Sequence, residues 1–389
     1  MMIPVLRLKN KEEKRILAGH LWVFSNEIGS IEGTPGVGNI VEVRSARNVL
    51  LGFGFYNPGT LIAVRIISKE FVEPDLKFFA DRLSSAMRLR RRLFSSNFYR
   101  LVYGESDFLP GLVVDRFDSL FSVQILSAGM EMRKDLIYQA IKDVFSPSAI
   151  YERNESQTRT LEGLQQGKSI VYGEEKSADY DEDGVVFRIN PYRGQKTGFY
   201  FDQRLNRIFS RRFAEGAKVL DLYSNEGGFA LNLSRSGASS VKAIDASGEV
   251  IESLAANAEL NSLKNVEMEA SDADVYMKKA IASGEKYDVV VCDPPSFTRN
   301  RKSVPAAKAA YRKLHEQVFQ ILNHEGILLT ASCSHHIFRE TFEEVISSAA
   351  GRTGRTLQLL HRAGASPDHP VLPSMPETEY LKFNAYRVI

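Results

Sequence analysis

The sequence predicts an α/β protein in which residues 191–389 form a doubly wound, mostly parallel sheet of seven strands, preceded by a small β-barrel and an α+β linking domain. Three observations predict this class. Short strand-like runs occupy residues 1–70, strands surround a helical stretch in residues 71–190, and strands alternate with helices from Lys218 onward. The alternation of apolar strands with helices is typical of a parallel sheet covered on both faces.

The composition is that of a globular protein with two or three domains. The chain has 389 residues, of which 43% are hydrophobic and 25% charged, and this length exceeds that of one ordinary domain. No apolar run approaches the roughly 18–20 residues that span a bilayer, and the N-terminal sequence lacks the features of a signal peptide. Two cysteines cannot build a disulfide framework. We therefore expect a cytoplasmic protein without a membrane segment.

Charge is nearly balanced, at a net +2, but arginines cluster in two helical stretches. The members are Arg88, Arg90, Arg91 and Arg92 in MRLRRRLF, and Arg204, Arg207, Arg211 and Arg212 in QRLNRIFSRRF. A solvated helix face explains either cluster alone better than a binding site does. Two clusters in one near-neutral chain modestly favour a polyanionic partner.

The first two regions are rich in strands. GNIVEVRS, NVLLGFGFYNP and TLIAVRIIS are short strands separated by turn residues, and this pattern favours a small barrel over residues 1–70. A helix is expected from about Pro74 to Phe94. In residues 71–190, strands such as GLVVDRFDSLFSVQIL and SAIYERN surround the helix MEMRKDLIYQAIKDVF, and GVVFRIN is entered through the turn DEDG.

The third region supplies the seven strands of the main sheet. In order they are KVLDLYS, VKAIDAS, VEMEASDAD, YDVVVCDPP, GILLTASCS, TLQLLHR and EYLKFNAYRVI. Helical sequences separate the first six, the longest being AAYRKLHEQVFQILNHEG. In such a sheet, ligands bind beyond the carboxyl ends of the strands, so the residues that close each strand are the candidates for chemistry.

The first strand leads into a glycine loop, VLDLYSNEGGFAL. Gly227 and Gly228 allow close approach of a ligand to the backbone at a helix N-terminus. The match to a dinucleotide-binding G-x-G-x-x-G loop is poor, because Asn225 replaces the first glycine and Glu226 lies within the turn. Asp221 and Glu226 would repel a pyrophosphate. A cationic sulfonium with an amino acid tail would be accepted.

Acids also close the next two strands. Asp245 lies near the separation from Asp221 at which an acid reaches a ribose hydroxyl pair, and Asp272 is placed to bind an adenine amino group. Each acid alone is better explained as a helix cap or turn residue. Three acids at successive strand ends, with Gly-Gly in the first loop, are hard to explain by capping alone.

The fourth strand ends in VVVCDPPSF. Pro294 and Pro295 fix the backbone after Asp293 and make a stiff loop suited to holding a planar base. A simple strand stop is the competing interpretation.

Several strings resemble one family. They are GHLWVFSNEI at 19–28, GESDFLPGLVVDRF at 104–117, GQKTGFYFDQRLNR at 194–207, and the shorter DPPSF and SCS. The third region resembles a class I S-adenosylmethionine-dependent methyltransferase domain with a Rossmann-like sheet. More narrowly, nearly the whole chain is similar to bacterial large-subunit ribosomal RNA cytosine carbon-5 methyltransferases with an N-terminal PUA domain. The string GQKTGFYFDQR is the most specific, and the glycine loop departs from the general methyltransferase pattern at Asn225.

The resemblance implies a PUA-like barrel at 1–70, a linking domain at 71–190 and a methyltransferase domain at 191–389, acting on large-subunit ribosomal RNA. It implies that S-adenosylmethionine contacts Tyr200, Gln203, Asp221, Tyr223, Ser224, Asn225, Gly227, Gly228, Phe229, Asp245, Ala246, Asn257, Asp272, Ala273, Asp293 and Pro294. The residues implied for the RNA substrate are Lys196, Arg204, Pro295 and Phe297.

Cys333, in TASCSHHI, is the candidate nucleophile. Carbon 5 of cytosine is a weak nucleophile, and addition of a thiolate to carbon 6 activates it. Cys333 follows the fifth strand, beside the fourth strand and Asp293 in the usual strand order, so Asp293 is the expected catalytic partner. An arbitrary cysteine is more often a buried hydrophobe, and Cys292, inside an apolar strand, fits that description. His335 and His336 either lower the pKa of the thiol or orient the loop.

Three alternatives stay open at this stage. The enzyme could methylate a base nitrogen, which needs no cysteine, or the chain could be an RNA-binding or ribosome-assembly factor with a vestigial donor site. A metal site at Cys333 and His336 is weakly supported, because no second cysteine pair accompanies them, so no metal is expected. The sequence does not decide whether the protein is a homodimer.

Overall fold

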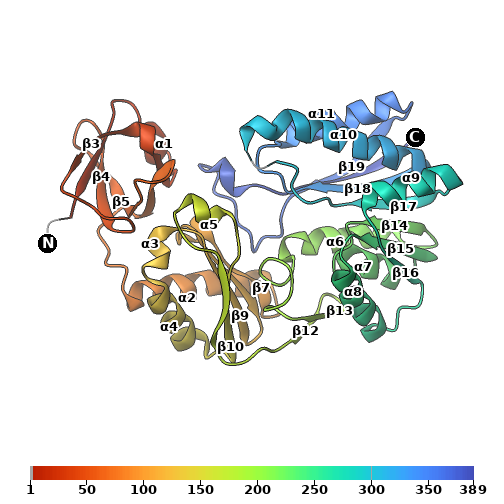
Figure 1. The fold of residues 1–389 in the computed structure, drawn as a ribbon, viewed down its shortest axis with the longest axis horizontal. Coiled ribbons are helices and arrows are strands. Elements are labelled where there is room, and N and C mark those ends of the chain that lie inside the picture. The colour runs from red at the N-terminus through yellow and green to blue at the C-terminus, as the bar shows by residue number, and fades with distance from the viewer. Residues whose placement is uncertain (1–2, 299) are drawn as a thin grey trace. The chain divides into compact units, whose positions relative to one another are not determined.

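A computed structural model describes residues 3–298 and 300–389 (Figure 1). The chain packs into two compact units. The first comprises the chain up to Tyr180 with Ile189–Phe201 and Pro367–Thr378, and the second comprises Asp181–Arg188, Asp202–Ser366 and Glu379–Ile389. The bounds of these units differ from the domain boundaries at residues 70 and 190, which remain predictions.

The first unit begins with a six-stranded sheet in the order β2-β6-β5-β4-β1-β3. Its core is formed by apolar residues that alternate along the strands, as in β4 with Val41 and Val43 both fully buried. The strands are β1 (Val5–Leu8), β2 (Trp22–Phe24), β3 (Ile28–Glu32), β4 (Ile40–Arg44), β5 (Leu50–Tyr56) and β6 (Ile62–Ser68), with the short helix α1 (Lys14–Leu17) after β1.

A second sheet of the first unit has five strands in the order β11-β10-β9-β8-β7 and packs against α2 (Leu76–Leu93) and α4 (Lys134–Phe145). Helix α2 begins where Asp75 accepts a hydrogen bond from the backbone N–H of Phe78. The strands are β7 (Phe98–Tyr103), β8 (Leu112–Phe117), β9 (Leu120–Ile125), β10 (Ala149–Asn154) and β11 (Gly167–Tyr172), with short helices α3 (Ala128–Glu131) and α5 (Thr158–Leu161).

The second unit contains the predicted seven-stranded sheet, in the order β16-β15-β14-β17-β18-β20-β19. Neighbouring strands from β16 to β18 are parallel, and β20 runs antiparallel between β18 and β19. The strands are β14 (Lys218–Leu222), β15 (Ser240–Asp245), β16 (Val266–Ala270), β17 (Tyr287–Cys292), β18 (Leu322–Ser332), β19 (Leu357–Ala363) and β20 (Lys382–Val388). The predicted fold class is therefore confirmed.

Helices cover both faces of this sheet, as expected for a doubly wound fold. Figure 1 shows α9 (Ala273–Ser283), α10 (Val304–Ile321) and α11 (Arg339–Arg352) on one face, with α6 (Arg204–Ser210), α7 (Gly228–Arg235) and α8 (Gly248–Leu260) on the other. The helix expected to extend to Gly326 ends earlier, because the chain becomes extended at Leu322 and pairs with β17. A hairpin of β12 (Ala178–Asp181) and β13 (Val186–Ile189) forms at the predicted DEDG turn.

The two arginine clusters are only in part the solvated helix faces that their sequences favour. Arg90 is 0% exposed and binds Asp107 and the backbone oxygen of Asp368, although Arg88, Arg91 and Arg92 are exposed. In the other cluster, Arg204 and Arg207 are buried, and Arg207 forms a two-pronged ion pair with buried Glu182. Sequence spacing could not show these acidic partners, since they lie in distant segments.

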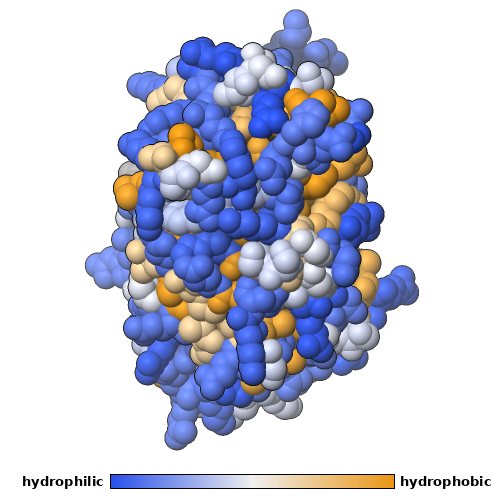
Figure 2. Space-filling view, turned by 90° about the vertical axis from the view of Figure 1, so that its right-hand side faces the viewer, coloured by the Kyte–Doolittle hydropathy of each residue, from blue (hydrophilic) through white to orange (hydrophobic). Residues whose placement is uncertain are grey.

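The surface is predominantly polar where Figure 2 displays it, with hydrophobic side chains exposed in several smaller areas. Within residues 3–298 and 300–389, the helices are all too short or too polar to cross a membrane.

Candidate active site

Most predicted site residues of the second unit lie at the carboxyl ends of five adjacent strands, β16, β15, β14, β17 and β18. Asp221 lies in β14, Asp245 ends β15, Asp293 follows β17, and Cys333 follows β18. Parallel pairing places Leu222 beside Cys292 and Cys292 beside Thr330. This register brings the acids, the glycine loop and the cysteine to one edge of the sheet.

The loop from β14 to α7 depends on glycine. Gly227 has a φ of +89°, and a Cβ atom at this position would lie 2.9 Å from Leu231 and 3.0 Å from Leu254. Only glycine combines this backbone conformation with so little space. The backbone N–H of Asn225 donates to Asp245 Oδ2 at 3.1 Å, which ties the loop to the end of β15.

Asp221 is the most deeply buried acid of the site, at 1% exposure. Its Oδ2 accepts a hydrogen bond from the backbone N–H of Ala230 at 2.9 Å. Burial, reinforced by repulsion from Asp293 and Asp245, raises the pKa of Asp221 well above its ordinary value, although the bond from Ala230 opposes this change. Asp221 therefore ties the end of β14 to the first turn of α7, which follows the glycine loop.

The other two acids also bind the local backbone. Asp245 accepts a second bond, from the N–H of Ser247 at 3.0 Å. Asp272 caps α9 by accepting from the N–H groups of Asp274 and Val275 at 2.9 and 3.2 Å. The capping explanation considered for the sequence thus applies to Asp272. A carboxylate oxygen accepts more than one bond, so capping leaves capacity for a ligand.

Two polar atoms in the loop are buried without a hydrogen-bond partner among the described residues, Ser224 Oγ and Glu226 Oε2. Burial raises the pKa of Glu226 to about 7. Buried polar atoms are normally satisfied, so this loop has unused capacity for a polar ligand. From the sequence, Glu226 was expected only to repel a pyrophosphate, and no spacing rule identifies it as a carboxyl group with a buried oxygen.

Gln203 connects the GFYFDQR segment to the Asp-Pro-Pro loop. Its side-chain amide donates to Asp293 Oδ2 at 2.9 Å, and its oxygen accepts from Asn206 at 2.6 Å. Gln203 and Arg204 are both buried. Tyr200 and Lys196, predicted for the same site, belong to the first unit, where the Lys196 ammonium lies 4.6 Å from the Tyr200 ring centre.

The two cysteines differ in exposure. Cys333 is partly exposed, and its Sγ lies 4.0 Å from the backbone oxygen of Pro294. Cys292 is 0% exposed and belongs to the hydrophobic core. Burial raises the pKa of the Cys292 thiol, which disfavours its reactive thiolate form. Cys292 is therefore the core thiol and Cys333 the more accessible one, and the catalytic role of Cys333 stays a prediction.

The serines on either side of Cys333 form a frame that the sequence did not reveal. The Tyr311 hydroxyl hydrogen-bonds to Ser332 Oγ at 2.8 Å and Ser334 Oγ at 3.1 Å. Ser334 Oγ also accepts from the N–H of Phe297 and bonds Ser296 Oγ, both at 3.2 Å. The loops after β17 and β18 are thus fastened together. The symmetric string SCS was the available signal, but Tyr311 lies on a helix distant in sequence.

Lys382 lies beside the cysteine loop, and His335 and His336 are part of it. Lys382, buried at the start of β20, donates to the backbone oxygens of Ser334 and Tyr380, each at 2.7 Å. His335 stacks on the Tyr380 ring, with centres 5.4 Å apart, whereas His336 is half-buried. Lys382 was not predicted, because a lysine in the mixed strand sequence LKFNAYRVI carries no signal of burial.

Several predicted contact residues have packing roles. The Phe229 ring lies against Phe383 and the Phe297 ring against Tyr311, and Ala273 belongs to the core. Asn257 accepts from the N–H of Arg188 at 2.8 Å. For these four, any ligand contact would come from backbone atoms or remaining edges. Of the other predicted residues, Gly228 is the first residue of α7, and four lie in the strand-end loops: Tyr223, Ala246, Pro294 and Pro295.

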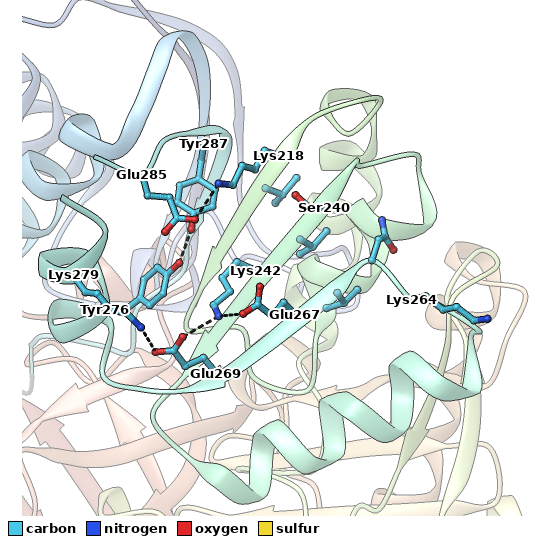
Figure 3. Close-up of a pocket in the computed structure, with 14 residues that line it drawn as sticks. Lys218, Ser240, Lys242, Lys264, Glu267, Glu269, Tyr276, Lys279, Glu285 and Tyr287 are labelled. Carbon is cyan, nitrogen blue, oxygen red and sulfur yellow. Dashed lines mark hydrogen bonds and ion pairs between the residues drawn. The ribbon is translucent and has the colours of Figure 1, made fainter. Parts of the chain in front are cut away.

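A cavity of about 650 Å³ opens at the opposite, amino ends of the strands (Figure 3). It is lined by charged side chains that neutralise each other, such as Lys242 with Glu269 at 2.9 Å and Lys218 with Glu285 at 3.0 Å. Ligands of doubly wound sheets bind at the carboxyl ends, so this cavity is separate from the site.

Across residues 3–298 and 300–389, no group of three or more His, Cys, Asp or Glu side chains is arranged to hold a metal ion.

Family models match two parts of the chain. A PUA-like domain matches residues 6–69, and the S-adenosylmethionine-dependent methyltransferase model matches residues 168–382. The second match covers more than half of the chain and contains every strand of the seven-stranded sheet except β20, of which it includes only the first residue.

Relatives and solved structures agree with these matches. Ribosomal RNA large subunit methyltransferase I of Shigella dysenteriae is 35% identical over 392 residues, covering 99% of this chain and 98% of the relative. A candidate SAM-dependent methyltransferase from Streptococcus mutans is 21% identical with a TM-score of 0.85, and a candidate methyltransferase complexed with SAH is 22% identical with a TM-score of 0.86. Each covers 99% of this chain and 100% of the solved one, and at this identity both show a shared fold.

Proposed function

The chain belongs to the S-adenosylmethionine-dependent methyltransferases, within them to the family of ribosomal RNA large subunit methyltransferase I, and on this premise we propose that it methylates carbon 5 of a cytosine in large-subunit ribosomal RNA. The observation that carries the proposal is the position of Cys333. It is partly exposed beside the Asp-Pro-Pro loop, at the carboxyl end of a strand adjacent to Asp293, while the other cysteine is core.

S-adenosylmethionine fits the residues present at the loop after β14. When bound, it supplies a methyl group on a positively charged sulfur. The orphaned atoms Ser224 Oγ and Glu226 Oε2 are available to polar groups of such a ligand, and the acids favour its positive charge. We propose that Asp245 binds the ribose hydroxyls and Asp272 the adenine amino group, with Asp221 holding the loop in shape.

Cys333 provides covalent catalysis in this proposal. Its thiolate forms a bond with carbon 6 of cytosine, and the electron pair of the 5,6 double bond becomes available at carbon 5 for methylation. Loss of the carbon 5 proton to a base then restores the double bond and expels Cys333 as a thiolate. The target nucleotide must leave its stack to reach the thiol.

Asp293 is proposed to hold the pyrimidine at its N3 and exocyclic amine edge. The hydrogen bond from Gln203 fixes one carboxyl oxygen of Asp293, which supports the orientation of the other. Lys196, Arg204, Pro295 and Phe297 remain proposals for substrate contact.

Replacement of Cys333 tests the covalent step. We expect Cys333→Ala to lose methyl transfer by more than about 10³-fold, because carbon 5 is then not activated. The assay uses a tritiated donor and deproteinised large-subunit ribosomal RNA. Cys292→Ala is the matched control, in which the other thiol is removed and transfer persists. Activity of Cys333→Ala near that of the wild type would contradict the covalent mechanism.

A trapping experiment tests the same step directly. RNA containing 5-fluorocytidine cannot lose a proton from carbon 5, so the covalent adduct should persist through denaturing electrophoresis. The adduct should form with the wild type and with Cys292→Ala and be absent from Cys333→Ala. An adduct with Cys333→Ala would assign the nucleophile to another residue.

Product analysis separates the remaining alternatives. Mass spectrometry of digested RNA should find 5-methylcytidine. A base methylated on nitrogen would indicate the alternative enzyme. Failure to bind S-adenosylmethionine at millimolar concentration in calorimetry would favour an RNA-binding or assembly factor.

We also propose a cytoplasmic location, which is supported by the ribosomal RNA named as substrate for the relatives. A homodimer, which the sequence left open, is tested by light scattering of the purified protein. A mass near 43.6 kDa would indicate a monomer.

A further inference from the structure

We propose that Lys382 is a positioning residue for Cys333: its buried ammonium group stabilises negative charge on the sulfur and holds the segment Ser332–Ser334 in place. The proposal rests on the assignment of Cys333 as nucleophile. It adds a source of thiol activation, the role for which only His335 and His336 were considered from the sequence.

The geometry surrounds the cysteine on two sides. Lys382 is paired with Ser332 across the antiparallel strands β20 and β18. Its side chain continues past that pair, and Nζ donates to the backbone oxygen of Ser334 at 2.7 Å. Lys382 is therefore in contact with both residues that flank Cys333, one through the strand register and the other through the ammonium group.

The ammonium group has hydrogen-bond partners but little compensation of its charge. Its two acceptors, the oxygens of Ser334 and Tyr380, are neutral carbonyls. Lys382 is 4% exposed, and burial of a charge is costly unless an opposite charge lies near. A thiolate at Cys333 is the opposite charge that a catalytic cycle would create there.

The pKa of Lys382 reflects this balance. Burial lowers it to about 8, the interaction with Cys333 raises it, Arg339 lowers it, and Glu379 raises it. Arg339 and Glu379 lie 3.6 Å apart and largely offset each other. Cys333 is thus the leading charge partner of the lysine, and by reciprocity a charged Lys382 favours the thiolate.

A purely structural lysine would act through its hydrogen bonds alone, and substitutions separate the two roles. Lys382→Gln keeps an N–H donor without charge, Lys382→Met keeps the aliphatic stem alone, and Lys382→Arg keeps the charge and the donors. If the charge matters, Lys382→Gln and Lys382→Met should reduce the thiolate fraction of Cys333 equally, and Lys382→Arg should preserve it. The structural role predicts that Gln resembles the wild type.

The readout is the pH profile of alkylation of Cys333 by iodoacetamide, followed by mass spectrometry of the full-length protein. Cys292, buried in the core, serves as an internal control. We expect the midpoint for Cys333 to rise by about one pH unit or more in Lys382→Met and Lys382→Gln, equivalent to roughly tenfold less thiolate at neutral pH. In Lys382→Arg it should stay near that of the wild type.

Lys242→Met is the matched control variant. Lys242 is a half-buried lysine of the same sheet whose charge is balanced by Glu269 at the opposite strand ends, so its removal should not move the Cys333 midpoint. An unchanged midpoint in Lys382→Met would overturn the proposal. Thermal unfolding shows whether Lys382→Met is folded. If it is not, an unchanged midpoint in Lys382→Gln would overturn the proposal instead.

The test also separates this proposal from the assignment of the nucleophile, because alkylation needs neither donor nor RNA. An active Cys333→Ala enzyme would refute the catalytic assignment whatever the midpoints. For the proposal itself, methyl transfer by Lys382→Gln should fall about tenfold at pH 7 and recover as the pH approaches 9.

Discussion

At the scale of single residues, the site depends on how each ionisable group is buried. Cys292 and Cys333 are the same residue type but differ in exposure. Cys292 lies in the core, whereas Cys333 is partly exposed beside a backbone carbonyl oxygen. Lys382 is likewise buried, although most lysine side chains are exposed. A sequence identifies which groups can titrate, but their burial is decided by packing from distant segments.

Glu226 gives a prediction for pH and stability. Burial raises its pKa from 4.5 to about 7, so the folded protein holds this proton more tightly than the unfolded chain. The associated stability is present below about pH 4.5 and is lost as the pH rises to about 7. Glu226→Gln should prevent this loss of stability, because the amide side chain does not ionise. In donor-free protein, it should raise the free energy of unfolding at pH 8 by up to roughly 3 kcal/mol.

Urea unfolding of the wild type and Glu226→Gln at pH 5 and pH 8 checks this prediction. The gain from the substitution should be much larger at pH 8. An equal change at both pH values would show that the carboxyl group is solvated in the folded protein.

At the scale of elements, the glycine loop between β14 and α7 offers a matched pair of substitutions. Gly227 and Gly216 have φ values of +89° and +68°, but only Gly227 is crowded, by Leu231 and Leu254. Gly216→Ala should cost about 1 kcal/mol through backbone strain. Gly227→Ala should cost more, because the side chains must also move, and should weaken donor binding.

Thermal unfolding and calorimetry with S-adenosylmethionine measure both effects. Donor affinity in Gly216→Ala should equal that of the wild type, since this turn lies at the start of β14. Equal effects of the two substitutions on affinity would mean that the loop does not contact the donor.

The strand-end pattern predicted the sheet and the position of the site because period and turn residues are local properties. The roles within the loops were less accessible. Asp272 was expected to bind a ligand and is also a helix cap, and Phe229 belongs to an aromatic stack with Phe383. The cap is a local interaction that the sequence already offered as an alternative, whereas the stacking depends on the relative placement of elements, which periodicity does not encode.

At the scale of the whole molecule, the chain passes repeatedly between its two units, and no composition change marks the crossings. Residues 181–188 belong to the second unit, although the sequence favoured a boundary at residue 190. Glu182 and Arg207 pair across 25 positions, and Arg90 binds the backbone of Asp368 across 278. The local hydrophobic periodicity of a sequence cannot predict contacts between residues so far apart along the chain.

Fragments that begin on either side of the hairpin β12–β13 test this organisation. A fragment of residues 191–389 lacks Glu182, Val186 and Arg188, so the buried Arg207 loses its partner and Asn257 and Asn261 lose theirs. Breaking a buried ion pair costs roughly 3–5 kcal/mol. The fragment should therefore unfold at lower temperature and bind S-adenosylmethionine more weakly than residues 178–389, which keep the hairpin. Equal melting and equal affinity of the two fragments would mean that residues 181–188 contribute nothing to the methyltransferase unit.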